Sequence, residues 1–350
     1  MIKEIQTDQL TSILLQYGLS GHYTIAEMES GMNNTTKRII VDNEHYMLRI
    51  YDNHQESSIV EVEHQMLQAL HQRSLTIQVP QVVISKCGNT YISTEQGKLV
   101  AMYRFINGNR PRAGYYPHIV SLGKAAALLT VEMASVTLPC SAQYDPYYLL
   151  PESYVALLQT DLTSYLIEEH KLLAEQVSDI NYIMDELSVI TTECKRLEDL
   201  PKQWIHGDIV CQNTVALEDE IIAILDFEFV AQDVRAMEPA VIAVDLMHRE
   251  NWLNDCPTQA VAVMMKEYLQ VIPLTQEELN EIPLLMKLRI FDVFLHVVTR
   301  YQQQLSPLSL LLEIIGTTVE NLRYINESND LQSIFFVGRN SYEFSRKIRL

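Results

Sequence analysis

The 350-residue sequence is poor in the features that mark several protein classes. Only 11 glycines and 12 prolines are present, and 47% of the residues are hydrophobic, which argues against a disordered chain. The five cysteines are odd in number, lie far apart and form no C-x-x-C pair. The sequence therefore predicts neither a disulfide framework nor a zinc knuckle.

Long apolar runs are also absent. No stretch approaches the roughly 18 residues that a membrane span needs, and the first residues lack the apolar run of a signal peptide. We therefore expect a protein of the reducing cytoplasm that has no membrane partner. The oligomeric state stays open.

Basic residues are outnumbered, with 26 Lys and Arg against 45 Asp and Glu, for a net charge of −19. This charge disfavours a nucleic-acid partner bound through a general basic surface. It would suit a cationic substrate, but it would equally result from an ordinary solvated surface, which is the favoured interpretation.

The chain divides into two differently patterned parts, as its length favours. Strand-like runs with one helix among them occupy residues 23–103, and mostly helical patterns follow Gly108. We predict an α+β fold with a small antiparallel-sheet N-terminal lobe at residues 1–104 and a larger helical C-terminal lobe at 105–350. Within these, 79–85 and 90–94 are expected strands, 57–72 an amphipathic helix, and 163–197 a long helical hairpin whose acids would either recruit a cation or form a solvated face.

A strand-like island at residues 204–229 interrupts the helical part. It contains Asp208, Asn213 five positions later, and Asp226 at the end of an apolar run. Phosphoryl transfer from ATP needs one carboxylate to orient the attacking hydroxyl, and an amide oxygen and a second carboxylate to hold Mg²⁺. Alternatively, the three residues are ordinary turn and strand-end residues.

The motif His-Gly-Asp-x-x-x-x-Asn followed by Asp-Phe-Glu resembles the catalytic and metal loops of the aminoglycoside phosphotransferase, choline kinase and homoserine kinase superfamily. The resemblance implies a protein-kinase-like fold, with ATP and Mg²⁺ as cofactors. It makes Asp208 the catalytic base, Asn213 and Asp226 the metal ligands, and His206 a structural support for the loop.

A turn at residues 30–37 lies between two predicted strands, where the superfamily has its nucleotide-covering loop. The resemblance implies that Gly31, Asn33, Asn34 and Thr35 contact phosphate oxygens through backbone and side-chain groups. The same residues would also suit a plain hairpin turn, so both interpretations stay open.

Arg49 is a single cation in an otherwise apolar strand, and a buried charge needs a partner. The superfamily has a phosphate-binding Lys or Arg here, paired with a helix Glu that Glu63 matches. Glu61 competes, but it lies about 200° away around the helix. Arg49 could also face solvent.

The apolar run at residues 100–108 resembles the interlobe hinge, so backbone groups near Tyr103 and Phe105 are expected at the adenine. After the metal loop, Glu238 stands where the superfamily commonly has a shorter Asp that braces the catalytic loop. Whether the longer acid makes that contact stays open.

These features predict a small-molecule kinase that phosphorylates a hydroxyl of a homoserine-like amino alcohol or hydroxy amino acid, a sugar or an aminoglycoside, with homoserine preferred. Two alternatives remain. One is a catalytically degenerate kinase fold kept as a binding or structural protein, as in spore-coat relatives. The other is an atypical protein Ser/Thr kinase, which the lack of a recognisable activation segment disfavours.

Overall fold

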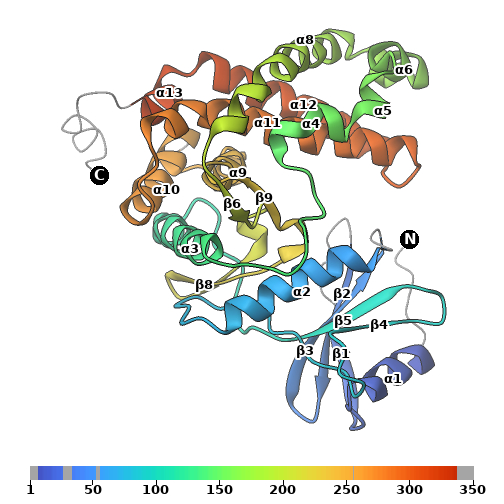
Figure 1. The fold of residues 1–350 in the computed structure, drawn as a ribbon. Helices are drawn as coiled ribbons and strands as arrows, with labels where there is room; N and C mark the ends of the chain where they lie inside the picture. Colours follow the sequence, from blue (N-terminus) through green and yellow to red (C-terminus); the bar gives the residue numbers. More distant parts are fainter. Residues whose placement is uncertain (1–6, 27–33, 53–55, 255, 337–350) are drawn as a thin grey trace.

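The computed structural model describes residues 7–26, 34–52, 56–254 and 256–336. A sheet-rich part lies at one end of the molecule and a mainly helical part at the other (Figure 1). The sheet has the strand order β1-β2-β3-β5-β4, and every pairing in it is antiparallel. Its strands are β1 (Tyr23–Ala26), β2 (Asn34–Val41), β3 (Glu44–Tyr51), β4 (Tyr91–Ser93) and β5 (Leu99–Arg104).

Two helices cover opposite faces of this sheet. Helix α1 (Thr7–Gln16), which the sequence analysis missed, packs against the face that carries Leu48 and Ile50. Helix α2 (Ser57–His71) packs on the other face, and its bounds confirm the predicted helix. Because side chains alternate along a strand, Arg49 and Tyr51 point to the α2 side.

The predicted strand at residues 79–85 is wrong. All of these residues are described, and they make only an isolated bridge from Val82 to Tyr103, next to one from Gln78 to Ala223. Pro80 has no backbone N–H to donate, so it interrupts any ladder through this segment. The other expected strand here is confirmed as β4.

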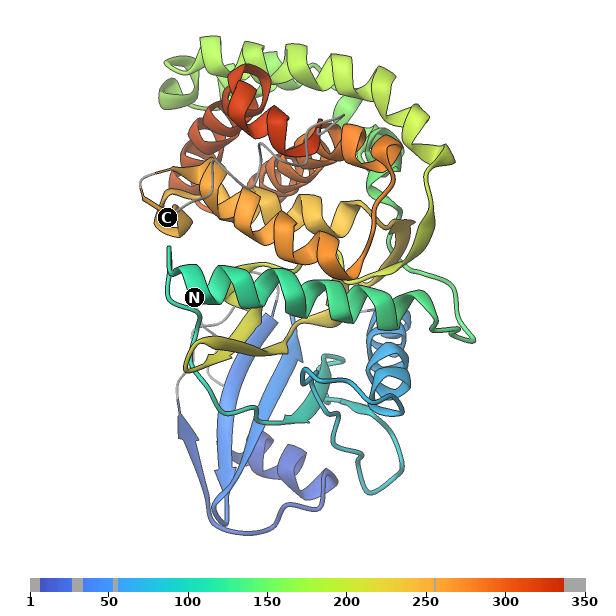
Figure 2. The same cartoon turned by 90° about the vertical axis from the view of Figure 1, so that its left-hand side faces the viewer.

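The helical part encloses two short two-stranded antiparallel sheets. One pairs β6 (Lys202–Ile205) with β9 (Ala231–Val234), and the other pairs β7 (Thr214–Leu217) with β8 (Glu220–Ile224). Figure 2 shows helix α3 (Tyr116–Ala134) crossing the molecule between the sheet-rich part and the helices beyond. A Cβ on Gly123 would lie 2.5 Å from the Met264 carbonyl oxygen, so glycine permits the close approach of α3 and α10.

Buried apolar side chains of the larger helices form most of the core. These helices are α9 (Met237–Leu246), α10 (Pro257–Val271), α11 (Gln276–Gln302), α12 (Leu308–Glu327) and α13 (Asn329–Phe335). Thr275 and Glu278 form a reciprocal capping box that fixes where α11 begins. Among the described residues, no helix is both long and apolar enough to cross a membrane.

The predicted long helical hairpin at 163–197 is broken into shorter pieces. They are α6 (Leu162–Glu169), α7 (Lys171–Ala174), α8 (Val177–Glu193) and the 3₁₀ turn η2 (Cys194–Asp199). His170 causes the first break, because its backbone is extended and its side chain caps α7 by accepting a bond from the Leu172 amide.

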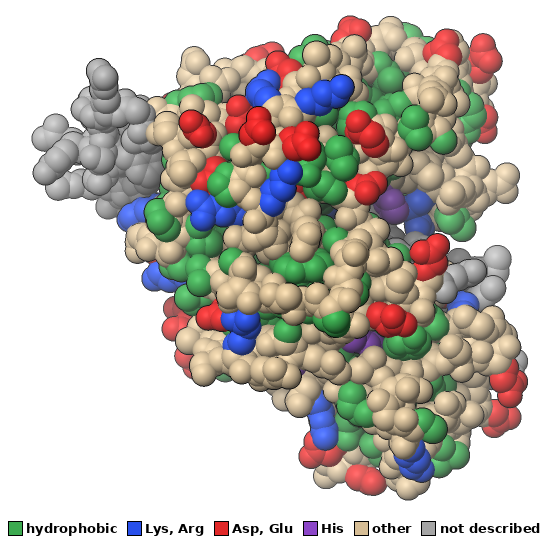
Figure 3. Space-filling model, viewed as in Figure 1, with side chains coloured by type: hydrophobic (Ala, Val, Ile, Leu, Met, Phe, Trp, Pro, Cys, Tyr) green, Lys and Arg blue, Asp and Glu red, His purple; other side chains and the backbone are tan. Residues whose placement is uncertain are grey.

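The remaining short elements are η1 (Tyr147–Leu149), α4 (Leu150–Ser153), α5 (Val155–Leu158), η3 (Cys211–Asn213), η4 (Phe227–Phe229) and η5 (Arg249–Asn251). All five cysteines are free thiols, as the sequence predicts. On the face drawn in Figure 3, Lys and Arg side chains are scattered among acidic ones. This face has no continuous basic surface of the kind that binds nucleic acid.

Candidate active site

The predicted catalytic loop leaves β6 through a sharp turn at Gly207. This glycine has φ +77°, and a Cβ there would lie 3.1 Å from the Phe229 carbonyl oxygen. Both the backbone conformation and the close approach favour glycine. The turn leads to Asp208, whose side chain contacts Asn213 and Arg289.

His206 stabilises this loop through both of its ring nitrogens. Its Nε2 lies 2.9 Å from the Leu225 carbonyl oxygen, and its Nδ1 accepts a 3.2 Å bond from the Asp208 amide. Burial lowers the pKa of His206 to about 4, so the ring is neutral at pH 7 with its proton on Nε2. His206 therefore connects the Asp208 backbone to the strand end that precedes Asp226.

Glu238 supplies the loop-bracing contact that the sequence left open. Its carboxylate accepts bonds from the His206 amide at 2.6 Å and from the Gly207 amide at 3.2 Å. Burial raises the pKa of Glu238 to about 7, against the effect of these two amides. The longer side chain thus reaches the loop from α9.

Asp208 lies between an amide and a guanidinium. Asn213 Nδ2 donates to Asp208 Oδ2 at 2.8 Å and to its backbone oxygen at 3.0 Å. Arg289 Nη2 forms an ion pair with Asp208 Oδ1. Burial raises the pKa of Asp208 to about 6, although Arg289 opposes the rise. A carboxyl group with a pKa in this range is suited to accept a proton.

Asp226 follows β8 in the left-handed region, with φ 66°, which Asp tolerates better than most residues. The Leu225 amide donates to the Asn213 carbonyl oxygen at 2.7 Å, so the strand end is tied to the catalytic loop. Arg49 Nη1 approaches Asp226 Oδ1 at 3.0 Å, off the direction of a hydrogen bond. This buried oxygen therefore has no hydrogen-bond donor among the described residues.

The N-terminal side of the site is an enclosed cluster around Glu63. Its carboxylate pairs with Arg49 at 3.2 Å and accepts the hydroxyls of Tyr51 at 2.9 Å and Tyr103 at 3.1 Å. Burial opposes the charge of Arg49, but Asp226 and Glu63 outweigh it and raise the guanidinium pKa. Glu61 is exposed and accepts the Tyr91 hydroxyl instead.

Of the predicted phosphate-loop residues, Gly31 and Asn33 lie outside the described residues. Asn34 is buried at the start of β2 and donates to Glu228 Oε2 at 2.5 Å. Thr35 donates to Asp52 Oδ2 at 2.6 Å. The structure thus connects β2 to the segment after Asp226, and phosphate binding by these residues stays a prediction.

The side chains of the two predicted hinge residues, Tyr103 and Phe105, lie in different environments. The Tyr103 hydroxyl lies in the Glu63 cluster, 2.9 Å from His64 Nε2. The Phe105 ring packs under the Arg38 guanidinium, and its amide donates to the His45 carbonyl oxygen. Adenine binding by backbone groups near these residues stays a prediction.

Comparison with known proteins identifies the family. Residues 24–261 match the APH phosphotransferase enzyme family, which is more than half of the chain. The chain belongs to this family. It is a small-molecule phosphotransferase with an alcohol group as acceptor, as predicted.

Two similar curated proteins are homoserine kinases, from Afipia carboxidovorans (21% identical over 285 residues) and Agrobacterium fabrum (22% over 288 residues). The alignments cover 81% of this chain in both cases, and 81% and 82% of those proteins.

Solved structures resemble the phosphotransferase over most of its length. A microcompartment-associated aminopropanol kinase aligns with a TM-score of 0.68 at 15% identity, over 95% of this chain and 100% of that one. An amicoumacin kinase in complex with AMP-PNP and Ca²⁺ aligns with a TM-score of 0.63 at 13% identity, over 89% and 93%. These likenesses confirm the two-lobe, kinase-like α+β fold.

The residues predicted to hold magnesium in this phosphotransferase fit the ion chemically. Asn213 uses its Nδ2 on Asp208, which leaves its amide oxygen for a cation. Asp226 adds the buried oxygen that lacks a donor. Among the residues described, no group of three or more His, Cys, Asp and Glu side chains could hold a metal. Phosphate oxygens and water would complete the coordination, as is usual for Mg²⁺.

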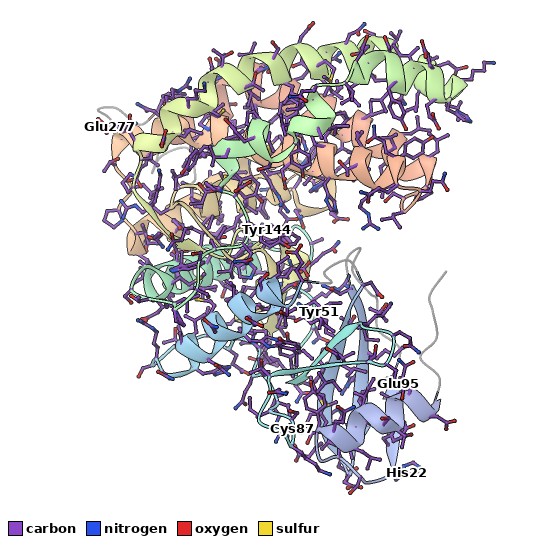
Figure 4. All side chains as sticks on the ribbon, turned by 45° about the vertical axis from the view of Figure 1, so that its right-hand side comes forward. His22, Tyr51, Cys87, Glu95, Tyr144 and Glu277 are labelled. Atoms are coloured by element: carbon purple, nitrogen blue, oxygen red, sulfur yellow. The ribbon has the colours of Figure 1, made fainter. Side chains whose placement is uncertain are left out.

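The sequence analysis missed a connected set of polar residues in the helical part that contacts Asp208 through Arg289. Arg289 and Asp292 come from α11, and Tyr147 and Tyr154 from the segment that begins at η1. Figure 4 shows Tyr144, just before η1, near the junction of the two parts, with Tyr51 on the opposite side. The available signal was a polar pair, three residues apart, in the otherwise buried middle of α11.

Proposed function

We propose that this phosphotransferase moves the γ-phosphoryl group of ATP to the hydroxyl of a small, amino-bearing metabolite, with homoserine as the first candidate. The acceptor oxygen attacks the γ-phosphorus, the bond from that phosphorus to the β-bridging oxygen breaks, and ADP leaves. Asp208 accepts the hydroxyl proton. Bound Mg²⁺ would offset charge on the phosphates, held by Asn213 and Asp226.

One observation carries this proposal: Asp208, Asn213 and Asp226, which are separated in the sequence, are joined by one continuous set of contacts. Asn213 binds Asp208 at 2.8 Å, and the Leu225 amide ties the Asp226 strand end to Asn213 at 2.7 Å. Arg49 then reaches Asp226 from the sheet at 3.0 Å. A general base, two oxygen ligands and a phosphate-binding cation are what phosphoryl transfer requires.

The identity of the acceptor is supported by the relatives rather than by a motif. Homoserine kinases align with 81% of this chain, although at only 21–23% identity. Substrate choice depends on side chains around Asp208, where relatives of one fold differ. We therefore take homoserine as the first compound to test, ahead of sugars and aminoglycosides.

A protein substrate is disfavoured by the segment after Asp226. The turn η4 and the strand β9 occupy it, β9 is paired with β6, and α9 begins at Met237. This short, paired segment leaves no long activation loop between the metal-binding Asp and the next helix. A small acceptor therefore fits the site better.

An ADP-release screen with Mg·ATP tests the proposal against homoserine, amino alcohols, sugars and aminoglycosides. We expect one amino-bearing acceptor class to be phosphorylated by the wild type. The Asp208→Asn variant should keep its thermal stabilisation by Mg·ATP but lose turnover. If saturating Mg·ATP stabilises neither protein, the degenerate binding-protein alternative is favoured instead.

A further inference from the structure

One face of α11 carries opposite charges toward the catalytic loop. Arg289 and Asp292 are three residues apart, so they share a side of the helix. Arg289 Nη1 lies 3.8 Å from Asp292 Oδ2. Their side chains keep 16% and 31% of their surface exposed, so both can be reached from solvent.

The Arg289 guanidinium is fixed directly beside the catalytic carboxylate. Its Nη2 pairs with Asp208 Oδ1, and its Nη1 donates to the Tyr147 hydroxyl at 2.8 Å. The Tyr147 hydroxyl in turn donates to the Gly207 carbonyl oxygen at 3.1 Å. Any anion that binds Arg289 is therefore held within a few ångströms of Asp208.

Asp292 is held in place but is not saturated. Its Oδ1 accepts the Tyr154 hydroxyl at 3.0 Å. Within the described part of the chain, its Oδ2 has only the loose 3.8 Å contact with Arg289. An ammonium group would find an acceptor there. Asp292 thus offers an open acceptor oxygen beside Arg289.

We propose that Arg289 and Asp292 bind the zwitterionic head of an α-amino acid, with Arg289 on the carboxylate and Asp292 on the ammonium group. In such a ligand the carboxylate and the ammonium group are attached to one carbon. They can therefore contact Arg289 and Asp292 together, because these two side chains are neighbours on one face of α11. The proposal rests on the function proposed above and narrows it to hydroxy amino acids. The side-chain hydroxyl then reaches Asp208.

The same arrangement gives Arg289 a second role when the substrate binds. In the structure, the guanidinium is shared between Asp208 and Tyr147. A substrate carboxylate would take part of this hydrogen-bonding capacity, because a guanidinium offers five N–H donors in a fixed fork. Asp208 is then held less tightly when the hydroxyl that it must deprotonate is present.

Three acceptors test the assignment, because two of them each lack one of the two charged groups of homoserine. L-Homoserine carries both groups, 3-aminopropan-1-ol lacks the carboxylate, and 4-hydroxybutanoate lacks the ammonium group. For the wild type, kcat/KM should be highest for homoserine by about 30-fold or more, since each missing charge removes one of the two proposed ion pairs with the substrate.

The ratio of kcat/KM for homoserine to that for 3-aminopropan-1-ol is the decisive measurement. Arg289→Gln should lower this ratio by about tenfold or more, because only homoserine loses a partner. Arg289→Lys should lower it less, since Lys keeps the charge but not the fork. Asp292→Asn should instead lower the ratio of homoserine to 4-hydroxybutanoate.

Lys287→Gln is the matched control. Lys287 lies two residues before Arg289 on α11, and it pairs with Glu186 of α8 at 3.0 Å. It is a partly buried cation of the same helix that does not contact Asp208, so both ratios should stay within about twofold of the wild type. Circular dichroism and the unfolding midpoint check that each variant folds.

The possible failures are separable. If the wild type phosphorylates homoserine but Arg289→Gln leaves the ratio unchanged, Arg289 only positions Asp208 and the inference is overturned while the function stands. Preference of the wild type for 3-aminopropan-1-ol or a sugar would also overturn it. If no acceptor is phosphorylated although Mg·ATP binds, the proposed function itself fails.

Discussion

Two arginines, one from each part of the molecule, reach the candidate active site, and they differ in how completely their partners are satisfied. Arg49 is anchored by Glu63, whose side chain is 1% exposed and also accepts two tyrosine hydroxyls, and from this anchor it reaches Asp226. Arg289 pairs with Asp208 and lies near Asp292, which is 31% exposed and incompletely bonded.

This difference suggests that Arg49–Glu63 is a structural ion pair, whereas Arg289 can exchange part of its pairing with Asp208 for a ligand. A carboxylate that is enclosed and fully hydrogen-bonded holds its arginine in one place, ready for nucleotide phosphates. A carboxylate that is partly open leaves its arginine able to take another anion. We therefore propose that the same kind of contact builds a fixed nucleotide side around Arg49 and an adaptable acceptor side around Arg289. Four measurements examine this comparison.

The largest expected effect is on the acceptor side. Asp208→Asn removes the proton acceptor, so kcat should fall by about 10³-fold or more, while Mg·ATP still stabilises the protein. Asp219→Asn is the control, since this carboxylate is exposed and bonds Arg112 on the surface. Turnover near the wild-type value in Asp208→Asn would remove Asp208 from the mechanism.

On the nucleotide side we expect a loss of stability. Glu63→Leu leaves Arg49 and two tyrosine hydroxyls without their shared acceptor, so the free energy of unfolding should fall by about 3–5 kcal/mol. Urea unfolding measures this, with Asp179→Asn of an exposed pair as the control, for which about 0–1 kcal/mol is expected. A cost below about 1 kcal/mol for Glu63→Leu would mean that the cluster is not a fixed support.

The brace between the two sides should respond to pH. Glu238 has a folded pKa of about 7, raised by burial from 4.5. Between these pH values the folded protein binds a proton that the unfolded chain has released, so stability falls as pH rises through this window.

Glu238→Gln cannot titrate, so it should remove up to about 3 kcal/mol of the fall in unfolding free energy between pH 4.5 and 7.5. Urea unfolding at several pH values, with the exposed Glu220→Gln as control, measures the difference. Parallel curves for the wild type and Glu238→Gln would contradict the assignment.

The smallest effect is expected where α11 begins. Thr275→Ala breaks the capping box, in which Thr275 Oγ1 accepts the Glu278 amide at 3.2 Å, and should cost about 1 kcal/mol. The ratio of homoserine to 3-aminopropan-1-ol should not change, because Arg289 lies almost four turns further along the helix. A changed ratio would show that the acceptor side depends on the helix end.

Much of the fold and part of the site could be predicted from local patterns. Alternation and helical spacing correctly predicted β3 and α2. The resemblance to the kinase superfamily implied the pairing of Arg49 with Glu63, which the structure confirms. These residues are 14 positions apart on adjacent elements. The strand expected at 79–85 was wrong because apolar content does not reveal that Pro80 interrupts the pairing, and the hairpin expected at 163–197 missed the break at His170.

The division into lobes at residue 104 stays a prediction, as do the catalytic role of Asp208 and the metal-binding roles of Asn213 and Asp226. The same holds for the nucleotide-binding roles given to Arg49, Glu63, Gly31, Asn33, Asn34, Thr35, Tyr103 and Phe105. Gly31 and Asn33 lie outside the described residues. For the others, the observed contacts are within the protein itself, and a ligand-binding role depends on groups that local patterns do not identify.

The sequence by itself determined the family of this protein, since the spacing of Asp208, Asn213 and Asp226 carries the family motif. Strand alternation placed Arg49 on the same face of β3 as Tyr51. Only the tertiary structure decided that Arg289, 81 positions after Asp208, lies against it with Asp292 beside it. Such a pairing depends on how α11 packs against the catalytic loop. A periodic pattern reports which face of a helix is buried, but not which distant residue that face meets.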